Sequence, residues 1–338
     1  MHKALRIGDA AALMRVLNEV NPALKQTGLA RVCGVDQSTV SRVLRGQPLR
    51  KAATVHAVLE QLQVPPRATT PAQALTGPDI DDDQHDALAH MDLAPSQVSA
   101  ASVSAVEQIL ASQRRLDDVV GAEALIPVTL SHMGVVSTWA DRARGVHAHR
   151  LRVAAAEYVQ FAGWLHASAG RMREATRFLD LAEAHAQEVD EPTLIAQARN
   201  FRGYIARHTH DPHAVVRHFL SAYSTPGAHP AQRMGDAAQA AQGYAVLGER
   251  DRALRLLESS AAWSQDADGQ PPPVTAYWLT GTFQRLNQGI AHLALGEHDV
   301  AADLLGSGLS GLPEDQQGAD WTVEYRQALE SARQGGGQ

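Results

Sequence analysis

The clearest hydrophobic pattern of the chain lies near its N-terminus. Val40, Val43 and Leu44 recur at the i, i+3 and i+4 spacing that places side chains on one face of a helix. Asp36 precedes them, and its carboxylate can accept hydrogen bonds from the free N–H groups of the first helical turn. Gly34 separates this segment from a shorter apolar one, because glycine adopts a left-handed backbone at little cost. The pattern predicts two short helices joined by a tight turn.

Similar patterns on both sides extend this unit. We expect a helix over residues 9–20, with Leu13 facing inwards, and a further helix over residues 50–62. Pro65 follows the second of these and ends it, since proline lacks a backbone N–H and clashes with the preceding helical turn. Residues 1–64 are therefore expected to form a small helical domain.

The helix predicted after Asp36 has a polar outer face. Its outward positions carry amide, hydroxyl and guanidinium groups, which can bond to base edges in the major groove of DNA. These positions are Gln37, Ser38, Ser41, Arg42 and Arg45. An ordinary helical hairpin is the alternative, but nothing in a hairpin requires so polar an outer face.

The segment from Gln26 to Gly46, QTGLARVCGVDQSTVSRVLRG, resembles the helix-turn-helix of lambda-repressor-like (XRE) regulators. Its VDQSTVSRV also resembles the recognition helix of the LacI family. The matching residues are Gln26, Leu29, Ala30, Gly34, Val35, Gln37, Thr39, Val40, Ser41 and Arg42. The resemblance implies base contacts by Gln37, Ser38, Thr39 and Arg42. It implies phosphate contacts by Lys25, Gln26, Ser41, Arg45, Arg50 and Lys51. Thr39 and Ser41 could equally bond to their own helix.

Charge is divided unevenly along the chain, whose formal net charge is −7. Residues 1–64 hold nine Lys or Arg and four Asp or Glu, a balance of +5, whereas residues 65–95 have a balance of −5. A basic segment on an acidic chain is typical of a DNA-binding module attached to a part that does not contact DNA. Residues 65–95 also lack periodicity, so we expect a flexible acidic linker there. A metal site at the DIDDD run is the less favoured alternative.

Helical periodicity returns over residues 96–149, where Val103, Val106 and Leu110 mark an apolar stripe. The run RRLDDVVGAEALIP resembles a segment found between the head and the helical body of actinobacterial XRE-type regulators. A long amphipathic helix after a linker suggests a dimerisation segment. Packing within the domain is the alternative.

Residues 150–334 contain a degenerate repeat. Each copy has a small residue in a first helix, a turn residue, and then Ala and apolar residues in a second helix. The small residues are Gly163, Gly203, Ala241 and Gly289, so the copies recur after 40, 38 and 48 residues. His210 replaces the turn glycine in the second copy. Small side chains at these positions allow the paired helices to approach closely.

The copies resemble tetratricopeptide (TPR) repeats, although their spacing exceeds the ~34 residues usual for this repeat. The resemblance implies an α-solenoid whose first helices line a concave groove. The implied groove residues are Glu157, Gln160, Trp164, Gln197, Asn200, Tyr204, Arg207 and Gln242. Amides, a guanidinium and aromatic rings suit an extended peptide. A face that only packs helices together is the alternative.

Composition supports an all-α fold, with an N-terminal helix-turn-helix domain and a C-terminal TPR-like α-solenoid. Aromatic residues make up 5% of the chain and alanine is abundant, which favours close-packed helices. There is no run of about 18 apolar residues and no signal-peptide pattern at the N-terminus. Cys33 is the single cysteine, which excludes an internal disulfide. We therefore expect a cytoplasmic protein with no membrane partner.

Motifs of enzymes and metal proteins are missing from the sequence. The densest run of histidines, His208, His210 and His213, falls at a predicted turn without the HExxH spacing, so a solvated loop is favoured over a metal site. There is no phosphate-binding loop and no nucleophile elbow. We expect no enzymatic activity, no cofactor and no metal.

Together the patterns predict a transcription regulator that binds a double-stranded DNA operator. A homodimer is expected, because one short recognition helix covers only a few base pairs. The layout resembles peptide-responsive quorum-sensing regulators of Gram-positive bacteria, which implies a body that binds a signalling peptide or a small molecule. The alternative is a DNA-bound scaffold whose body recruits a protein partner without sensing a ligand.

Overall fold

The chain divides into two compact units, residues 1–74 and 75–338. Within the part that the computed structural model describes, the protein is all-α, and its one β contact is an isolated bridge between Gln97 and Arg144. The described residues are 10–20, 25–47, 49, 54, 58, 61, 75 and 80–336. The expected all-α class is thus confirmed for these residues.

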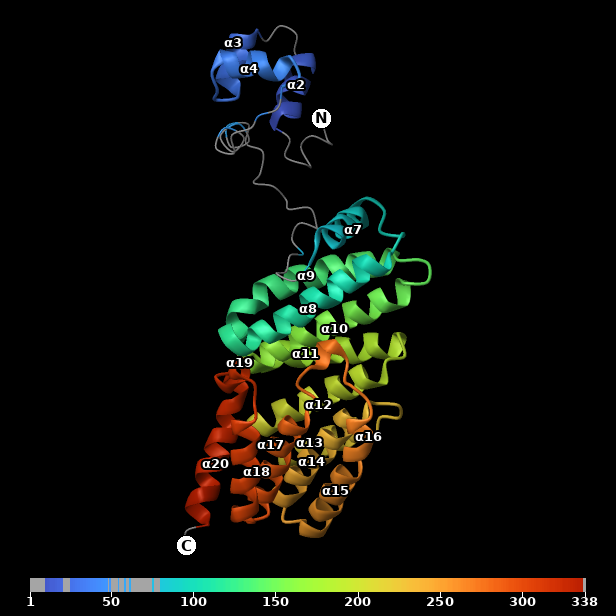
Figure 1. Ribbon diagram of the computed structural model, residues 1–338, viewed down its shortest axis with the longest axis vertical. Helices are drawn as coiled ribbons and strands as arrows, with labels where there is room; N and C mark the ends of the chain where they lie inside the picture. The colour runs from blue at the N-terminus through green and yellow to red at the C-terminus, as the bar shows by residue number, and fades with distance from the viewer. Residues whose placement is uncertain are drawn as a thin grey trace. The chain divides into compact units, whose positions relative to one another are not determined.

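Short helices form the described part of the first unit. They are α2 (Ala10–Val20), α3 (Gln26–Val32) and α4 (Gln37–Leu44) (Figure 1). Their apolar faces meet in one core, where Met14, Leu29 and Val40 are fully buried and Cys33 packs as a small apolar side chain. The helices predicted on either side of the tight turn are therefore present. Most of the helix predicted over residues 50–62, with Arg50 and Lys51, lies outside the described residues.

The turn between α3 and α4 has the geometry that its residues predict. Gly34 has a φ of 65°, a left-handed conformation that an L side chain would strain. Asp36 then caps α4, since its carboxylate accepts a hydrogen bond of 2.7 Å from the backbone N–H of Thr39. These two residues fix the direction in which the chain enters α4.

Part of the acidic segment is helical, so the prediction of a flexible linker up to residue 95 was wrong. Residues Asp82–Leu93 form α7, which packs on α8 (Ala100–Val120). Asp81 and Gln84 form a reciprocal capping box at the start of α7, and Leu88 is buried on its inner side. The acidic run therefore occupies the first helical turn, where the helix dipole favours negative charge.

Helices α8 and α9 (Ala122–Arg142) belong to the same body as the repeats, because both contact α10 (Ala148–Ser168). The predicted stripe of α8 is buried, with Val103, Val106 and Leu110 inaccessible to solvent. This arrangement corresponds to the packing alternative for residues 96–149. Dimerisation through this segment stays a prediction.

The rest of the second unit consists of consecutive helical pairs, consistent with a helical repeat body (Figure 1). The pairs are α10 with α11 (Met172–Glu188), α12 (Pro192–His208) with α13 (Pro212–Tyr223), α14 (Pro230–Val246) with α15 (Arg250–Ala262), and α17 (Gly281–Ala294) with α18 (His298–Ser310). Between α15 and α17 lie α16 (Ser264–Asp268) and η1 (Val274–Ala276). The chain ends with α19 (Glu314–Gln317), η2 (Asp320–Thr322) and α20 (Val323–Gly335), the last of which packs on α18.

Close contacts between paired helices occur at the predicted small residues. A Cβ atom on Gly203 of α12 would lie 2.6 Å from the ring of Phe219 on α13. A Cβ atom on Gly289 would likewise lie 2.6 Å from Leu305. These distances are too short for any carbon–carbon contact, so the two crossings require glycine at these positions. The turn inside the second pair also matches its prediction, since His210 adopts the left-handed φ of 56°.

No described helix combines the length and the apolar character that crossing a membrane requires.

Replacing Gly203 by Ala is expected to destabilise the second unit by about 1–3 kcal/mol, the usual cost of overpacking a filled core. Phe219 is fully buried and its ring cannot swing into solvent to make room. Gly134→Ala is the matched control, because Gly134 lies within α9 with open space around it. This control should gain about 0.5–1 kcal/mol from helix propensity. Urea unfolding of both variants measures the difference, and equal effects would contradict the close crossing.

Candidate functional site: an aromatic cavity in the helical body

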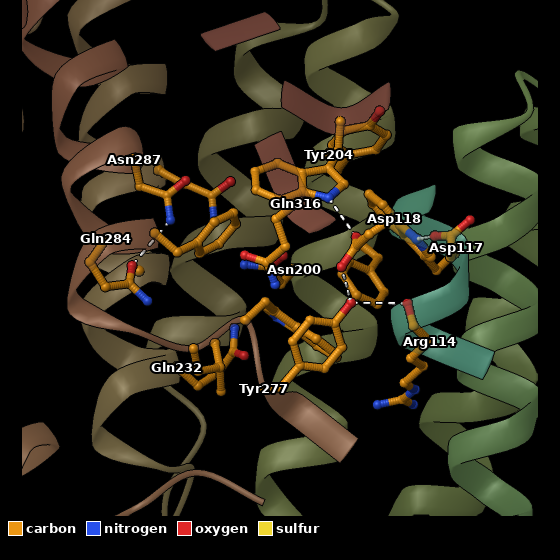
Figure 2. Close-up of a pocket in the computed structure, with 18 of the residues that line it drawn as sticks. Arg114, Asp117, Asp118, Asn200, Tyr204, Gln232, Tyr277, Gln284, Asn287 and Gln316 are labelled. Atoms are coloured by element: carbon orange, nitrogen blue, oxygen red, sulfur yellow. Dashed lines mark hydrogen bonds between the residues drawn. The ribbon is translucent and has the colours of Figure 1, made fainter. Parts of the chain in front are cut away.

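The second unit contains a cavity of about 90 Å³ between its helical pairs. Helices α8, α10, α12, α14, α17 and α20 contribute to its wall, as do the segment after η1 and residues near α19 and η2. Figure 2 shows Arg114, Asp117 and Asp118 of α8 on one side, with Gln284 and Asn287 of α17 on the other. The inner faces of the first helices therefore line this cavity, while α8 and the C-terminal segment close it.

Aromatic side chains are concentrated in this cavity. It is lined by nine of the chain's sixteen Phe, Trp and Tyr residues. These are Phe161, Trp164, Phe201, Tyr204, Tyr277, Trp278, Phe283, Trp321 and Tyr325. Several rings touch one another, as Trp164 does with Phe201 and Tyr204 at centroid distances of 5.0 and 5.1 Å. In a chain so poor in aromatic residues, this gathering marks the cavity as distinct from ordinary core.

Most of the groove residues predicted from the sequence lie at this cavity. Its wall includes Gln160, Trp164, Asn200, Tyr204 and Arg207. The remaining three predictions, Glu157, Gln197 and Gln242, do not line it.

Each of these three has a different environment. Glu157 pairs with the buried guanidinium of Arg114, and Gln197 accepts a hydrogen bond from the amide of Gln160. Gln242 lies in a neighbouring surface pocket, because α14 presents Gln232 and Gln239 to the cavity instead. The spacing of TPR repeats thus predicts most of the cavity residues in the first two copies. In the third copy it selects Gln242, which lies about one helical turn beyond the cavity residue Gln239.

The residues of α8 at the cavity were not predicted as site residues, although the sequence contains a signal for them. Arg114 and Asp117 continue the apolar stripe of Val103, Val106 and Leu110 at helical spacing. Charged residues on the buried side of an amphipathic helix need partners or a polar cavity. The same reasoning could not have found the contributions of the C-terminal segment, which depend on the path of the chain after α18.

Two cavity arginines are neutralised by neighbouring carboxylates. The Nη2 atom of Arg114 lies 3.7 Å from Glu157 Oε2 and donates to Gln160 Oε1 over 2.7 Å. Arg207 binds both carboxylate oxygens of Glu324, at 3.1 and 3.0 Å. The bidentate pair fixes the plane of the Arg207 guanidinium, whereas Arg114 and Glu157 form a single, longer ion pair. Neither arginine therefore leaves an uncompensated positive charge in the cavity.

Asp117 and Asp118 form the opposite case, two adjacent carboxylates without a cationic partner. No Lys, Arg or His of the described residues forms an ion pair with either one. Trp164 Nε1 donates to Asp117 Oδ2 over 2.8 Å, and Trp321 Nε1 donates to Asp118 Oδ1 over 2.9 Å. The hydroxyl of Tyr277 lies 2.5 Å from Asp118 Oδ2. Neutral donors therefore hold both carboxylates in place.

Burial makes the negative charge of these carboxylates unfavourable. It raises the pKa of Asp117 to about 6, against the opposing effect of the Trp164 hydrogen bond, and Asp118 and Asp320 raise it further. Burial also raises the pKa of Asp118, which Tyr277 and Trp321 oppose by donating to the carboxylate. The nearby charges that raise the pKa of Asp117 are thus all negative, and no cationic side chain of the described residues pairs with it.

A third carboxyl group lies beneath the amides of the cavity. The Oδ1 atom of Asp236 accepts hydrogen bonds from Asn200 at 2.5 Å and from Gln232 at 2.8 Å. Its Oδ2 atom is buried without a hydrogen-bond partner. Complete burial raises the pKa of Asp236 to about 8, although both amides oppose the shift. This group is therefore a neutral acid at neutral pH.

The predicted DNA-contacting residues lie on α4 and at the start of α3. Most are exposed, namely Lys25, Gln26, Gln37, Ser38, Arg42 and Arg45. Ser41 is half-buried and Thr39 is buried. The hydroxyl of Thr39 donates to Asp36 and accepts from Arg42, which is the local role that the sequence left open. Hydrogen bonds from Ser38 and Thr39 lower the pKa of Asp36 to about 2.

Among the described residues, no group of three or more His, Cys, Asp or Glu side chains is placed to hold a metal ion. The histidines that the sequence singled out are separated by the turn between α12 and α13. His208 bonds to the carbonyl of Tyr204 within α12, whereas His213 belongs to α13.

Comparison with family models, with characterised proteins and with solved structures finds no match for this chain.

The stability of the second unit is expected to fall as pH rises from about 4 to about 8, because folded Asp236 keeps a proton that the unfolded chain releases. The slope for one such group is at most about 1.4 kcal/mol per pH unit. Asp236→Asn mimics the protonated acid, so it should flatten this slope and raise stability most at pH 8 and above. Urea unfolding followed by tryptophan fluorescence measures it, since all five Trp residues belong to this unit.

The exposed carboxylate of Asp141 provides the control for this measurement. Asp141→Asn should leave the pH dependence of the wild-type protein unchanged. An unaltered slope in Asp236→Asn would mean that Asp236 is already ionised in the folded state.

Proposed function

We propose that this protein is a sequence-specific, homodimeric DNA-binding regulator of transcription whose TPR-like body binds a signal ligand. The first unit supplies a helix-turn-helix of the XRE type, and the second unit supplies the ligand site. The observation that carries the proposal is the face of α4, where apolar residues point to the core and polar residues with guanidinium groups point outwards.

The details of α4 support DNA binding by this face. Val40 and Val43 are buried, so the orientation of the helix in its unit is fixed. Gln37, Arg42 and Arg45 are exposed on the other side, and their side chains suit base edges and phosphates. The hydrogen bond of 2.9 Å from Arg42 to Thr39 holds the guanidinium near the helix N-terminus, where recognition helices contact bases.

The segments that form the wall of the cavity support ligand binding by the second unit. The cavity wall draws on helices from several pairs and on both ends of the second unit, so a ligand bound there would lie between segments that are far apart in the chain. A ligand that prefers one arrangement of these helices shifts the equilibrium between arrangements by the difference in its affinities. A preference of a few kcal/mol is sufficient for such a switch.

A homodimer follows from the size of the DNA-contacting face. α4 has eight residues, and a helix of this length reads only a few base pairs. Two copies related by a two-fold axis double the interface and predict an operator with an inverted repeat. Footprinting on genomic DNA with the purified full-length chain tests DNA binding and operator symmetry together.

Replacing Arg42 by Ala is expected to cost about 1–3 kcal/mol of discrimination at one base pair of each half-site, as loss of a bidentate guanine contact does. Quantitative footprinting of wild-type and substituted operators measures this loss. Arg173→Ala, which removes an exposed charge from α11, is the control and should bind as the wild type does. Retention of the wild-type base preference by Arg42→Ala would remove Arg42 from the set of base-contacting residues.

A further inference from the structure

We infer that the aromatic cavity binds a small organic cation, with an ammonium group beside Asp117 and Asp118 and carbon substituents against the surrounding rings. The role of this cation as a signal rests on the proposed function, whereas its binding does not. The inference follows from the charges, the rings and the size of the cavity.

Two buried carboxylates of the cavity have no positively charged partner in the part of the chain that the structure describes, although the other charged groups are paired. Arg114 with Glu157 and Arg207 with Glu324 are neutral pairs, so they neither attract nor repel an ion strongly. Asp117 and Asp118 have no cationic partner within the described residues, and both are more than nine-tenths buried. A buried carboxyl group that stays ionised is otherwise paired or bound to a cation. A positively charged ligand would supply the missing charge.

The rings beside these carboxylates favour an organic cation over a metal ion. Trp164, Tyr277 and Trp321 hydrogen-bond to the two carboxylates, so their rings lie directly beside the charge. Aromatic faces attract ammonium groups, and cages of such rings bind methylated and quaternary ammonium ions. The cavity already uses this attraction, since the guanidinium of Arg114 lies 5.3 Å from the ring centroid of Trp278 and that of Arg207 lies 5.7 Å from the ring centroid of Tyr204. A hydrated metal ion would gain nothing from the apolar rings.

An anionic ligand is disfavoured by the same arrangement. The guanidinium of Arg114 donates to Thr275, Glu157 and Gln160, and that of Arg207 donates to Glu324 and Gln239. An acidic group would have to displace these partners and would then face two carboxylates. In a buried site, the acidic group of a ligand and the two carboxylates would repel one another strongly, because the effective dielectric constant is low there.

The volume limits the size of the occupant. A cavity of about 90 Å³ accommodates a compact group, since a cavity of ~150 Å³ binds benzene. The ammonium group can belong to a free amine or to the N-terminus of a short peptide, and both present the same charge to the carboxylates. We therefore assign the chemistry of the head group and let the experiment identify its source.

Titration of the full-length protein with small probes tests the inference. The probes are tert-butylammonium and tetramethylammonium, with the neutral tert-butanol and the anionic pivalate as size-matched comparisons. Trp164, Trp278 and Trp321 line the cavity and report binding by fluorescence, and calorimetry gives the affinity independently. We expect saturable binding of at least one cation, and no saturable binding of the neutral or the anionic probe.

Asp117→Asn provides the decisive variant. It removes the charge but keeps an oxygen that can accept the hydrogen bond from Trp164, so the fold should persist, and thermal unfolding checks this. Cation affinity should drop about ten- to a hundredfold, the range for loss of a charged hydrogen bond. Asp141→Asn removes an exposed charge from α9 and should bind cations as the wild type does.

Two results would overturn the inference. One is the absence of saturable binding of both cations at millimolar concentrations, and the other is equal cation affinity in wild type and in folded Asp117→Asn. A tripeptide with a free N-terminus, compared with its N-acetylated form, separates the two sources of the ammonium group. Operator footprinting on the same preparation keeps the two proposals apart, because DNA binding without cation binding rejects only the cation site, and cation binding without DNA binding rejects only the regulator.

Discussion

The burial of two adjacent carboxylates is the constraint on which the rest of the helical body depends. Asp117 and Asp118 lie on α8 but are held by Trp164 of α10, Tyr277 before α17 and Trp321 of η2. A carboxylate removed from water must recover hydrogen bonds from the protein. These donors come from segments up to two hundred residues apart in the chain. The hydrogen bonds therefore connect the start of the body with its C-terminal end at the wall of the cavity.

The paired helices provide the frame in which these contacts can form. A glycine lies where the two helices of a pair cross, as Gly203 does against Phe219. The absence of a side chain there lets the two helices approach closely at that point. Repeating the crossing places the first helices side by side with their inner faces towards one space. An open solenoid would leave that space as a groove. Here α8 and the segment around α19, η2 and α20 pack across it, and the rings of Trp321 and Tyr325 from that segment narrow the space to a small cavity.

The sequence predicted the parts of this structure that depend on local periodicity. The two short helices around Gly34, the pairing of the repeat helices and the left-handed turn at His210 follow from spacing and backbone preference. The prediction failed at α7, because its capping box was hidden within an acidic run that resembles a linker. It also missed the cavity residues on α8 and in the C-terminal segment. The positions of the C-terminal residues follow from the return of the chain across the first helices, a long-range contact that no local pattern encodes, whereas Arg114 and Asp117 continue the predicted stripe of α8.

Comparing the carboxyl groups of the cavity without and with a bound cation suggests how a cation could act as a signal. Without a cation, burial favours protonated carboxyls, and the raised pKa of Asp117 expresses that cost. A bound cation would make the ionised state favourable and would strengthen the hydrogen bonds from Trp164 and Trp321, since bonds to a charged acceptor are the stronger ones. Those bonds join α8 to α10 and to η2, so the ligand would tighten contacts between segments that no single helical pair connects. On this proposal the ligand acts through the stiffness of the closed body, and its differential affinity for the tightened state is the free energy that regulation can use.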